Sequence, residues 1–125
     1  MIGQFIMVAL GGAVGACLRF ATGLAVVRAG FTGFPVAVLG ANVIGSLLMG
    51  IAVVWLDAKG LRDWQPFVMA GLLGGFTTFS AFSLEAYTLF QRGDAGLAAL
   101  YIILSVVLSI SALVAGVALA KGALA

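Results

Sequence analysis

Long uncharged runs of apolar residues alternate along the chain with short polar segments. The runs extend from Met1 to Leu18, from Pro35 to Leu56, from Trp64 to Leu84 and from Ala95 to Ala120. A helix needs about 20 mostly apolar residues to cross the hydrocarbon core of a bilayer. The pattern therefore predicts an all-α integral membrane protein in which residues 1–125 form a single domain with four transmembrane helices, over residues 2–27, 34–56, 66–90 and 95–120.

The third of these spans is predicted to be broken near the middle of the membrane. Between Gly71 and Ser80 it contains three glycines and three hydroxyl residues, and such a composition is unfavourable for a continuous helix. A break frees backbone N–H and C=O groups, which are tolerated at membrane depth only where protein or a cavity surrounds them. Broken helices of this kind often mark an ion site.

Composition agrees with a chain embedded in lipid. Of 125 residues, 64% are hydrophobic and 8% are charged, whereas a soluble domain carries roughly 25% charged residues. The chain has one cysteine and no histidine, which excludes a disulfide framework and a Cys/His metal site within one chain. The net charge of +2 arises without any basic run, so we expect the lipid bilayer, and no nucleic acid, as a partner.

Basic residues are divided almost evenly between the two ends of the predicted bundle. The end with both termini carries three, and the other end carries two with a third just inside the span: Lys59, Arg62 and Lys121 against Arg28, Arg92 and Arg19. The positive-inside rule then gives almost no preferred orientation. Copies inserted in opposite directions can pair about a twofold axis in the membrane plane, which predicts an antiparallel, dual-topology homodimer.

Polar residues recur at helical spacing within the other spans. Asn42 precedes Ser46 by one turn, and Tyr101, Ser105 and Ser109 follow one another at four-residue steps. Polar groups at membrane depth are costly and are candidates for function. For Asn42 a structural alternative stays open, namely an interhelical hydrogen bond that only holds the bundle together.

Two phenylalanines follow the predicted break three residues apart. Phe79 and Phe82 have Ser80 and Ser83 beside them, although most aromatic pairs at this spacing only pack. Asn, Ser, Thr and Tyr donate hydrogen bonds, and phenyl rings have partly positive edges. Together these groups could replace the water around a small anion without binding it too tightly to leave, and Arg19 could draw anions into a vestibule.

The stretch Gly74-Gly75-Phe76-Thr77-Thr78-Phe79-Ser80-Ala81-Phe82-Ser83-Leu84-Glu85 resembles the signature of the CrcB/Fluc family of fluoride channels. The segments 12–20 and 42–45, and the series Tyr101, Ser105 and Ser109, are similar to the same family. The chain departs from the family pattern at two places, because Ala81 stands where a hydroxyl residue is usual and Ala37-Val38 stand where Gly-Thr is usual.

The resemblance implies a passive, fluoride-selective channel and not an enzyme. It also implies a location in the cell membrane, which for a bacterium is the inner membrane. It implies a dual-topology homodimer with two pores, each lined by both subunits. The pore residues that it implies, with Arg19 at a vestibule, are Asn42, Phe79, Phe82, Ser83, Tyr101, Ser105 and Ser109. The same resemblance implies a structural sodium ion on the twofold axis, held by the backbone carbonyls of Gly74 and Thr77 from both subunits.

Two other functions stay open at this point. A small multidrug exporter also has four helices and often pairs antiparallel, but it exchanges protons through a carboxylate in its first helix, where this chain has none. The one carboxylate within a span, Glu85, is expected to make a structural hydrogen bond. Alternatively, the chain could be a noncatalytic assembly subunit whose polar residues only join helices, and such a subunit would carry no ion flux.

Overall fold

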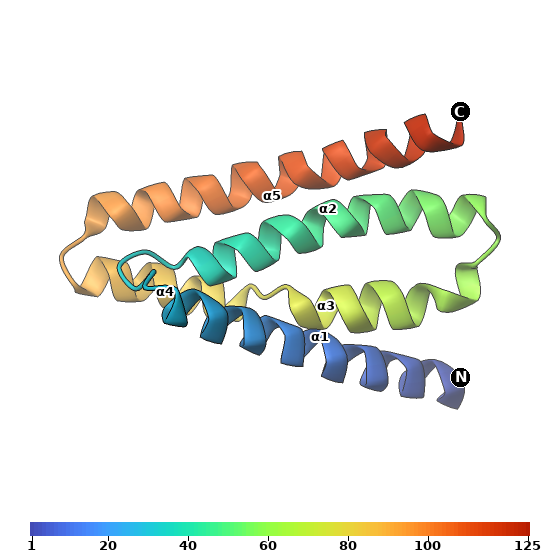
Figure 1. Ribbon diagram of the computed structural model, residues 1–125, viewed down its shortest axis with the longest axis horizontal. Coiled ribbons are helices and arrows are strands. Elements are labelled where there is room, and N and C mark those ends of the chain that lie inside the picture. Colours follow the sequence, from blue (N-terminus) through green and yellow to red (C-terminus); the bar gives the residue numbers. More distant parts are fainter.

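Four apolar helical stretches run alongside one another in the computed structural model, which describes residues 1–125. Those long and apolar enough to cross a membrane are Ile2–Arg28, Val36–Ala58, Arg62–Gln91 and Ala95–Leu124. Both termini lie at the same end of the bundle, and the connections over 29–35 and 92–94 lie at the opposite end (Figure 1). The prediction of an all-α protein with four membrane-length helices is confirmed.

Three of the crossings are single helices, and the third is built from pieces. The single helices are α1 (Ile2–Arg28), α2 (Val36–Ala58) and α5 (Ala95–Leu124). The third crossing consists of η1 (Arg62–Trp64), the π-helical η2 (Pro66–Leu73), α3 (Gly74–Phe76) and α4 (Ser80–Gln91). Helix α5 continues past residue 120 to Leu124, and Lys121 in its last turn complements the negative end of the helix dipole.

Glycines in the left-handed conformation end three of these helices. Gly30, Gly60 and Gly93 follow α1, α2 and α4 with φ values of 91°, 70° and 84°. Only glycine adopts this conformation without steric cost, and it lets the next N–H groups bond back to the last carbonyls of the helix. The ends of these helices therefore follow directly from the sequence.

The third crossing is interrupted at Thr77–Phe79, between α3 and α4 (Figure 1). Thr77 is extended, with φ −87° and ψ 156°. The break lies within the predicted stretch, but it falls on the hydroxyl residues and Phe79. The three glycines of the stretch are all helical: Gly71, Gly74 and Gly75.

Two of those glycines, Gly71 and Gly75, serve helix packing. A Cβ atom on Gly75 would lie 2.6 Å from the carbonyl oxygen of Gly12, and one on Gly71 would lie 3.0 Å from the Cα of Gly11. Two backbones approach this closely only when neither carries a side chain at the crossing. Glycine in this segment therefore joins the third crossing to α1 and leaves the helix intact.

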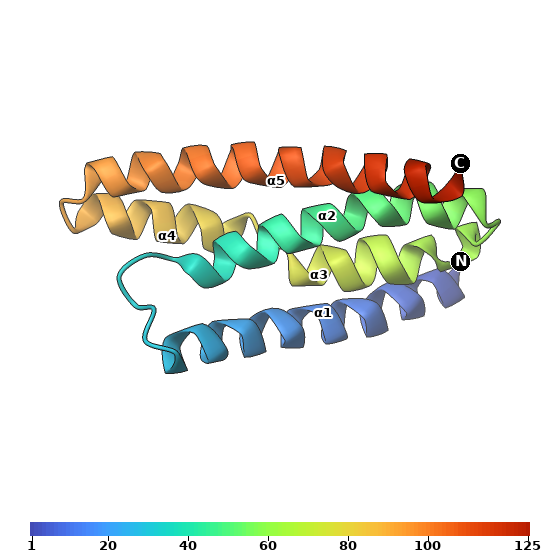
Figure 2. The ribbon, with the colours of Figure 1, turned by 45° about the horizontal axis from the view of Figure 1, so that its top comes forward.

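A second glycine contact joins α2 to α5. A Cβ atom on Gly50 would overlap the carbonyl oxygen of Leu113, and one on Gly116 would overlap that of Leu47. In both views α1 and α5 lie on opposite sides of α2 and the third crossing (Figures 1 and 2). The two glycine contacts thus fix the outer helices to the inner part of the bundle.

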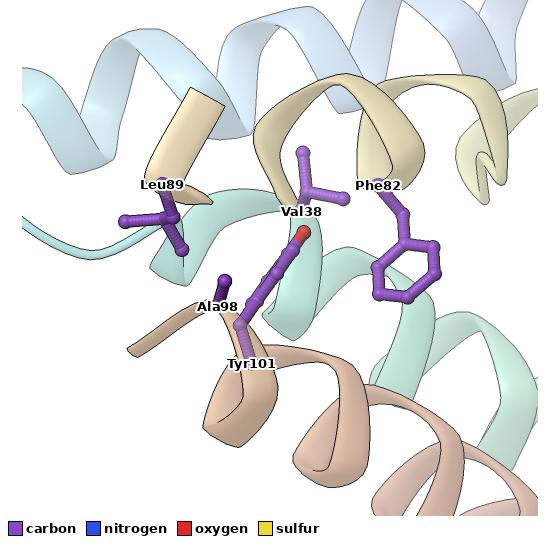
Figure 3. Packing of buried hydrophobic residues seen from close by; sticks show 5 residues of the cluster. All are labelled: Val38, Phe82, Leu89, Ala98 and Tyr101. Carbon is purple, nitrogen blue, oxygen red and sulfur yellow. The ribbon is translucent and has the colours of Figure 1, made fainter. Parts of the chain in front are cut away.

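Two small apolar clusters lie on either side of the break. One contains Val38, Phe82, Leu89, Ala98 and Tyr101, from α2, α4 and α5 (Figure 3). The other contains Ala52, Leu56 and Leu73. Only 17 of 125 residues are buried, so most apolar side chains face outward, as expected for a surface that lipid or a second copy covers.

We predict that Gly75→Ala lowers the free energy of unfolding by about 1–3 kcal/mol, because the added methyl group overpacks the contact with Gly12. Thermal unfolding in detergent measures the change. The matched control is Gly23→Ala in α1, where a Cβ atom meets nothing within 4 Å, and this variant should match the unchanged protein or exceed it. Equal stability of both variants would contradict the packing role of Gly75.

Candidate functional site

A side-chain amide pairs with the backbone at the helix break. The Nδ2 of Asn42 donates to the carbonyl oxygen of Thr78 at 2.9 Å, and the N–H of Thr78 donates to Oδ1 of Asn42 at 2.8 Å. These bonds satisfy a peptide group that the break leaves outside any helix. Asn42 therefore does make the structural hydrogen bond considered above, and one of its two amide N–H bonds remains uncommitted.

Hydroxyl groups close the helix ends on both sides of this pair. Thr77 Oγ1 donates to the carbonyl oxygen of Leu73 at 2.9 Å in the preceding turn. Thr78 Oγ1 accepts the N–H of Ala81 at 3.2 Å and lies 3.2 Å from Ser80 Oγ. Threonine and serine commonly compete for backbone groups in this way at helix ends. The hydroxyl residues of the third span thus make and stabilise the break.

The carbonyl oxygens of Gly74 and Thr77 are among those at the break that accept no hydrogen bond. In a continuous helix the N–H of Thr78 would bond to Gly74, but here it bonds to Asn42. Likewise the N–H of Ala81, which would bond to Thr77, bonds to the Thr78 hydroxyl. Uncommitted carbonyl oxygens are ligands that hard cations prefer, so both residues fit a cation site.

The first turn of α4 has free donors instead. The N–H groups of Phe79, Ser80 and Phe82 donate no backbone hydrogen bond. Helix α4 has 12 residues, and the N-terminus of a helix carries partial positive charge from its aligned peptide dipoles. The break therefore presents carbonyl oxygens on one side and N–H groups on the other, of which the latter favour an anion.

A groove of about 500 Å³ opens beside the break, between α2, α3 and α5. Five of the predicted pathway residues line it, together with both predicted sodium ligands: Asn42, Phe79, Phe82, Ser105 and Ser109, with Gly74 and Thr77. The buried Oγ atoms of Ser105 and Ser109 have no hydrogen-bond partner within the chain. A buried hydroxyl without a partner costs about 1–3 kcal/mol, so a partner from outside the chain would stabilise these two serines.

Aromatic rings continue from the groove into the first apolar cluster. The Phe79 side chain is 77% exposed in the groove, whereas Phe82 is 8% exposed. The centroid of the Phe82 ring lies 5.3 Å from that of Phe79 and 5.3 Å from that of Tyr101. Phe34, which precedes Pro35, packs edge-on against Tyr101 at 5.6 Å. The sequence analysis missed Phe34, because it lies in a connection outside the predicted polar stripes.

Two of the predicted pathway residues lie away from the groove. Ser83 is exposed on α4, and its hydroxyl donates to the carbonyl oxygen of Phe79 at 3.0 Å. Tyr101 is fully buried, and its hydroxyl donates to Oε2 of Glu85 at 3.1 Å. The expected hydrogen bond of Glu85 is therefore present, and Tyr101 lies one turn before the groove residue Ser105.

Arg19 lines a second cavity, of about 610 Å³, between α1, the 29–35 connection and α4. Its Nε donates to the carbonyl oxygen of Gly75 at 3.2 Å, near the C-terminal end of α3, where a positive charge is favourable. Glu85 and Arg92 line the same cavity, and Arg92 donates to the carbonyl oxygen of Gly33 at 3.4 Å. We call this space the vestibule cavity.

Comparison with known proteins assigns the family. The family model described as CrcB-like protein, Camphor Resistance (CrcB), matches residues 6–117. A fluoride-specific ion channel FluC of Ruegeria sp. (strain TM1040) is 63% identical over 118 residues, 94% of each chain. Those of Roseobacter denitrificans and Cereibacter sphaeroides are 57% and 54% identical, over 95% and 98% of this chain and 96% and 98% of theirs.

These matches span all four apolar helices and the break between α3 and α4, and they identify a multi-pass membrane protein. The chain belongs to the CrcB family, among whose members its similar relatives are named fluoride-specific ion channels.

Proposed function

We propose that the chain is a fluoride-specific ion channel, which lets fluoride leave the cytoplasm passively and so lowers fluoride toxicity. Relatives that match nearly its whole length carry this name. Within the structure, the groove beside the break carries the proposal, because buried hydroxyls without partners line it. The function is conduction by a single membrane domain and involves no covalent chemistry.

The lining of the groove suits a small anion. The hydroxyls of Ser105 and Ser109 and the remaining amide N–H of Asn42 are neutral donors. The exposed ring of Phe79 offers a partly positive edge. Such groups can replace the hydration shell of fluoride, and without a lysine in the groove they hold the ion weakly enough for it to leave.

The pore is completed by a second, antiparallel copy. The groove is open on one side, and most of the apolar surface of the chain is exposed, so the donors of one chain need a cover. The break lies near the middle of the bundle (Figure 1), where a twofold axis in the membrane plane brings two breaks together. Each of two pores is then lined by both subunits.

A sodium ion on that axis would use the carbonyl oxygens of Gly74 and Thr77 from both subunits. Both oxygens are free of hydrogen bonds and line the groove. A cation between them would satisfy polar groups that otherwise remain unpaired at membrane depth. Its role is structural, because it would neutralise the carbonyl dipoles where the two breaks meet.

Arg19 draws anions toward the vestibule cavity, which it lines with Arg92. From there the pathway passes Tyr101, whose ring contacts Phe82, and continues to the groove serines. Ser83 lies on the exposed side of α4 and contributes at the rim. A negative interior drives the anion outward, since each 100 mV is equivalent to about 2.3 kcal/mol per charge.

A proton-coupled exporter and an assembly subunit are less well supported. Helix α1 contains no Asp or Glu that could carry protons, and the relatives are named as channels. A subunit that only joins helices would gain nothing from two buried serine hydroxyls that have no partner.

Fluoride efflux from liposomes containing the purified protein tests the function. Vesicles loaded with potassium fluoride should release it when valinomycin is added, as a fluoride electrode measures, whereas protein-free vesicles should retain it. Ser105→Ala and Ser109→Ala should each slow the efflux several-fold while leaving the unfolding temperature unchanged or higher, because each removes a buried hydroxyl without a partner.

Vesicles that hold folded protein but stay tight to fluoride would contradict the channel. Full efflux in both serine variants would be compatible with a channel but would show that the two hydroxyls are not part of its pathway. A fall in both efflux and stability would instead assign them a packing role.

The orientation of the copies has its own test. We expect that about half of the copies place each end of the bundle outside the cell, because basic residues are balanced between the ends. In a Cys17→Ser background, Gly122→Cys and Thr32→Cys report on opposite ends, and a membrane-impermeant maleimide on intact cells should label about half of each. Full labelling of one variant and none of the other would show a single orientation.

A further inference from the structure

The vestibule cavity and the groove are separate spaces within one chain. They share no lining residue, although on α2 the vestibule residue Val38 precedes the groove residue Asn42 by one turn. On α4 the vestibule residue Ala81 is adjacent to the groove residue Phe82. The wall between the two cavities is therefore formed where α2 packs against α4.

This wall is apolar. Val38 and Phe82 belong to one buried cluster with Tyr101 (Figure 3), and Ala81 packs against this cluster. Val38 is 9% exposed, and it lines the vestibule cavity one turn before the groove residue Asn42, so a buried apolar side chain stands where the two cavities come closest along α2. The one polar atom of the cluster, the Tyr101 hydroxyl, already donates to Glu85. The side chains of Val38 and Ala81 themselves carry no hydrogen-bond donor.

Both sides of the wall are polar by contrast. The vestibule cavity has Arg19 and Arg92 together with the Glu85 carboxylate, and the groove has Asn42, Ser105 and Ser109. A fluoride ion that moves between them exchanges one set of polar contacts for the other across a short apolar segment. Moving a charge past a site without donors is costly, and apolar constrictions in channels limit flow by excluding water.

We propose that Val38 and Ala81 form a dry constriction between the vestibule cavity and the groove, and that Val38 sets the rate at which fluoride passes. The inference rests on the proposed channel function and adds a rate-determining residue to it. Val38 and Ala81 belong to the same chain, so each copy carries both side chains of the constriction. The pore donors downstream then determine which ion is accepted, and Val38 determines how fast.

Replacing Val38 by residues of similar size but different polarity tests the constriction. Val38→Thr keeps the shape and adds a hydroxyl, and we expect the efflux rate from liposomes to rise about threefold to tenfold. Val38→Ile adds a methyl group without a donor and should lower the rate. Ala81→Ser adds a hydroxyl from the opposite wall and should raise the efflux rate. This variant tests the constriction if Val38→Thr fails to fold.

The control is Val53→Thr, an exposed position on α2 outside both cavities, whose efflux rate should stay unchanged. Simple damage to packing would slow both Val38 variants, so opposite effects of Thr and Ile support the constriction. Chloride efflux should remain at the level of protein-free vesicles, because a faster rate that comes with a chloride leak reports a loosened fold and counts against the proposal.

Unchanged or slower fluoride efflux in both Val38→Thr and Ala81→Ser, with normal efflux from the unchanged protein, would overturn the constriction alone. Absence of efflux from the unchanged protein would overturn the channel function itself, and the constriction with it.

Discussion

The two hydrogen bonds between Asn42 and the Thr78 peptide are the interaction on which the rest of the site depends. A helix interrupted at membrane depth must pair its freed backbone groups. The side-chain amide of Asn42 in α2 pairs with both the N–H and the carbonyl oxygen of Thr78. By holding the Thr78 N–H, Asn42 leaves the Gly74 carbonyl uncommitted. The same bonds fix the residue at which α4 begins. They therefore also fix the direction in which the free N–H groups of its first turn point.

Around this pair, each residue type has a distinct task. Glycines let α1 approach the third crossing and α5 approach α2, threonines close the helix ends, and serines of α5 face the groove without partners. A fold that only had to be stable would have no reason to bury hydroxyls in this way. The cost of these unpaired groups is consistent with a protein whose partner in the groove is a passing ion.

The sequence predicted four membrane-length helices, because long uncharged apolar runs are rarely found outside a membrane. It placed the break in the right stretch but did not say whether the glycines or the hydroxyl residues would form it, since composition alone does not distinguish a flexible glycine from one that a neighbouring helix requires. The close approach of α2 and α5 at Gly50 and Gly116 was missed because these residues lie on different helices, far apart in the chain. Helical spacing put Tyr101 and Ser105 in one stripe, but only the structure shows that Tyr101 is turned to Glu85.

The most direct measurement is fluoride efflux from liposomes that contain Asn42→Ala, compared with Val53→Ala, an exposed position on α2 outside both cavities. The account predicts that Asn42→Ala loses nearly all efflux, because the Thr78 peptide is left unpaired and the break loses its shape, while Val53→Ala keeps it. Efflux from Asn42→Ala at the rate of the unchanged protein would contradict the account.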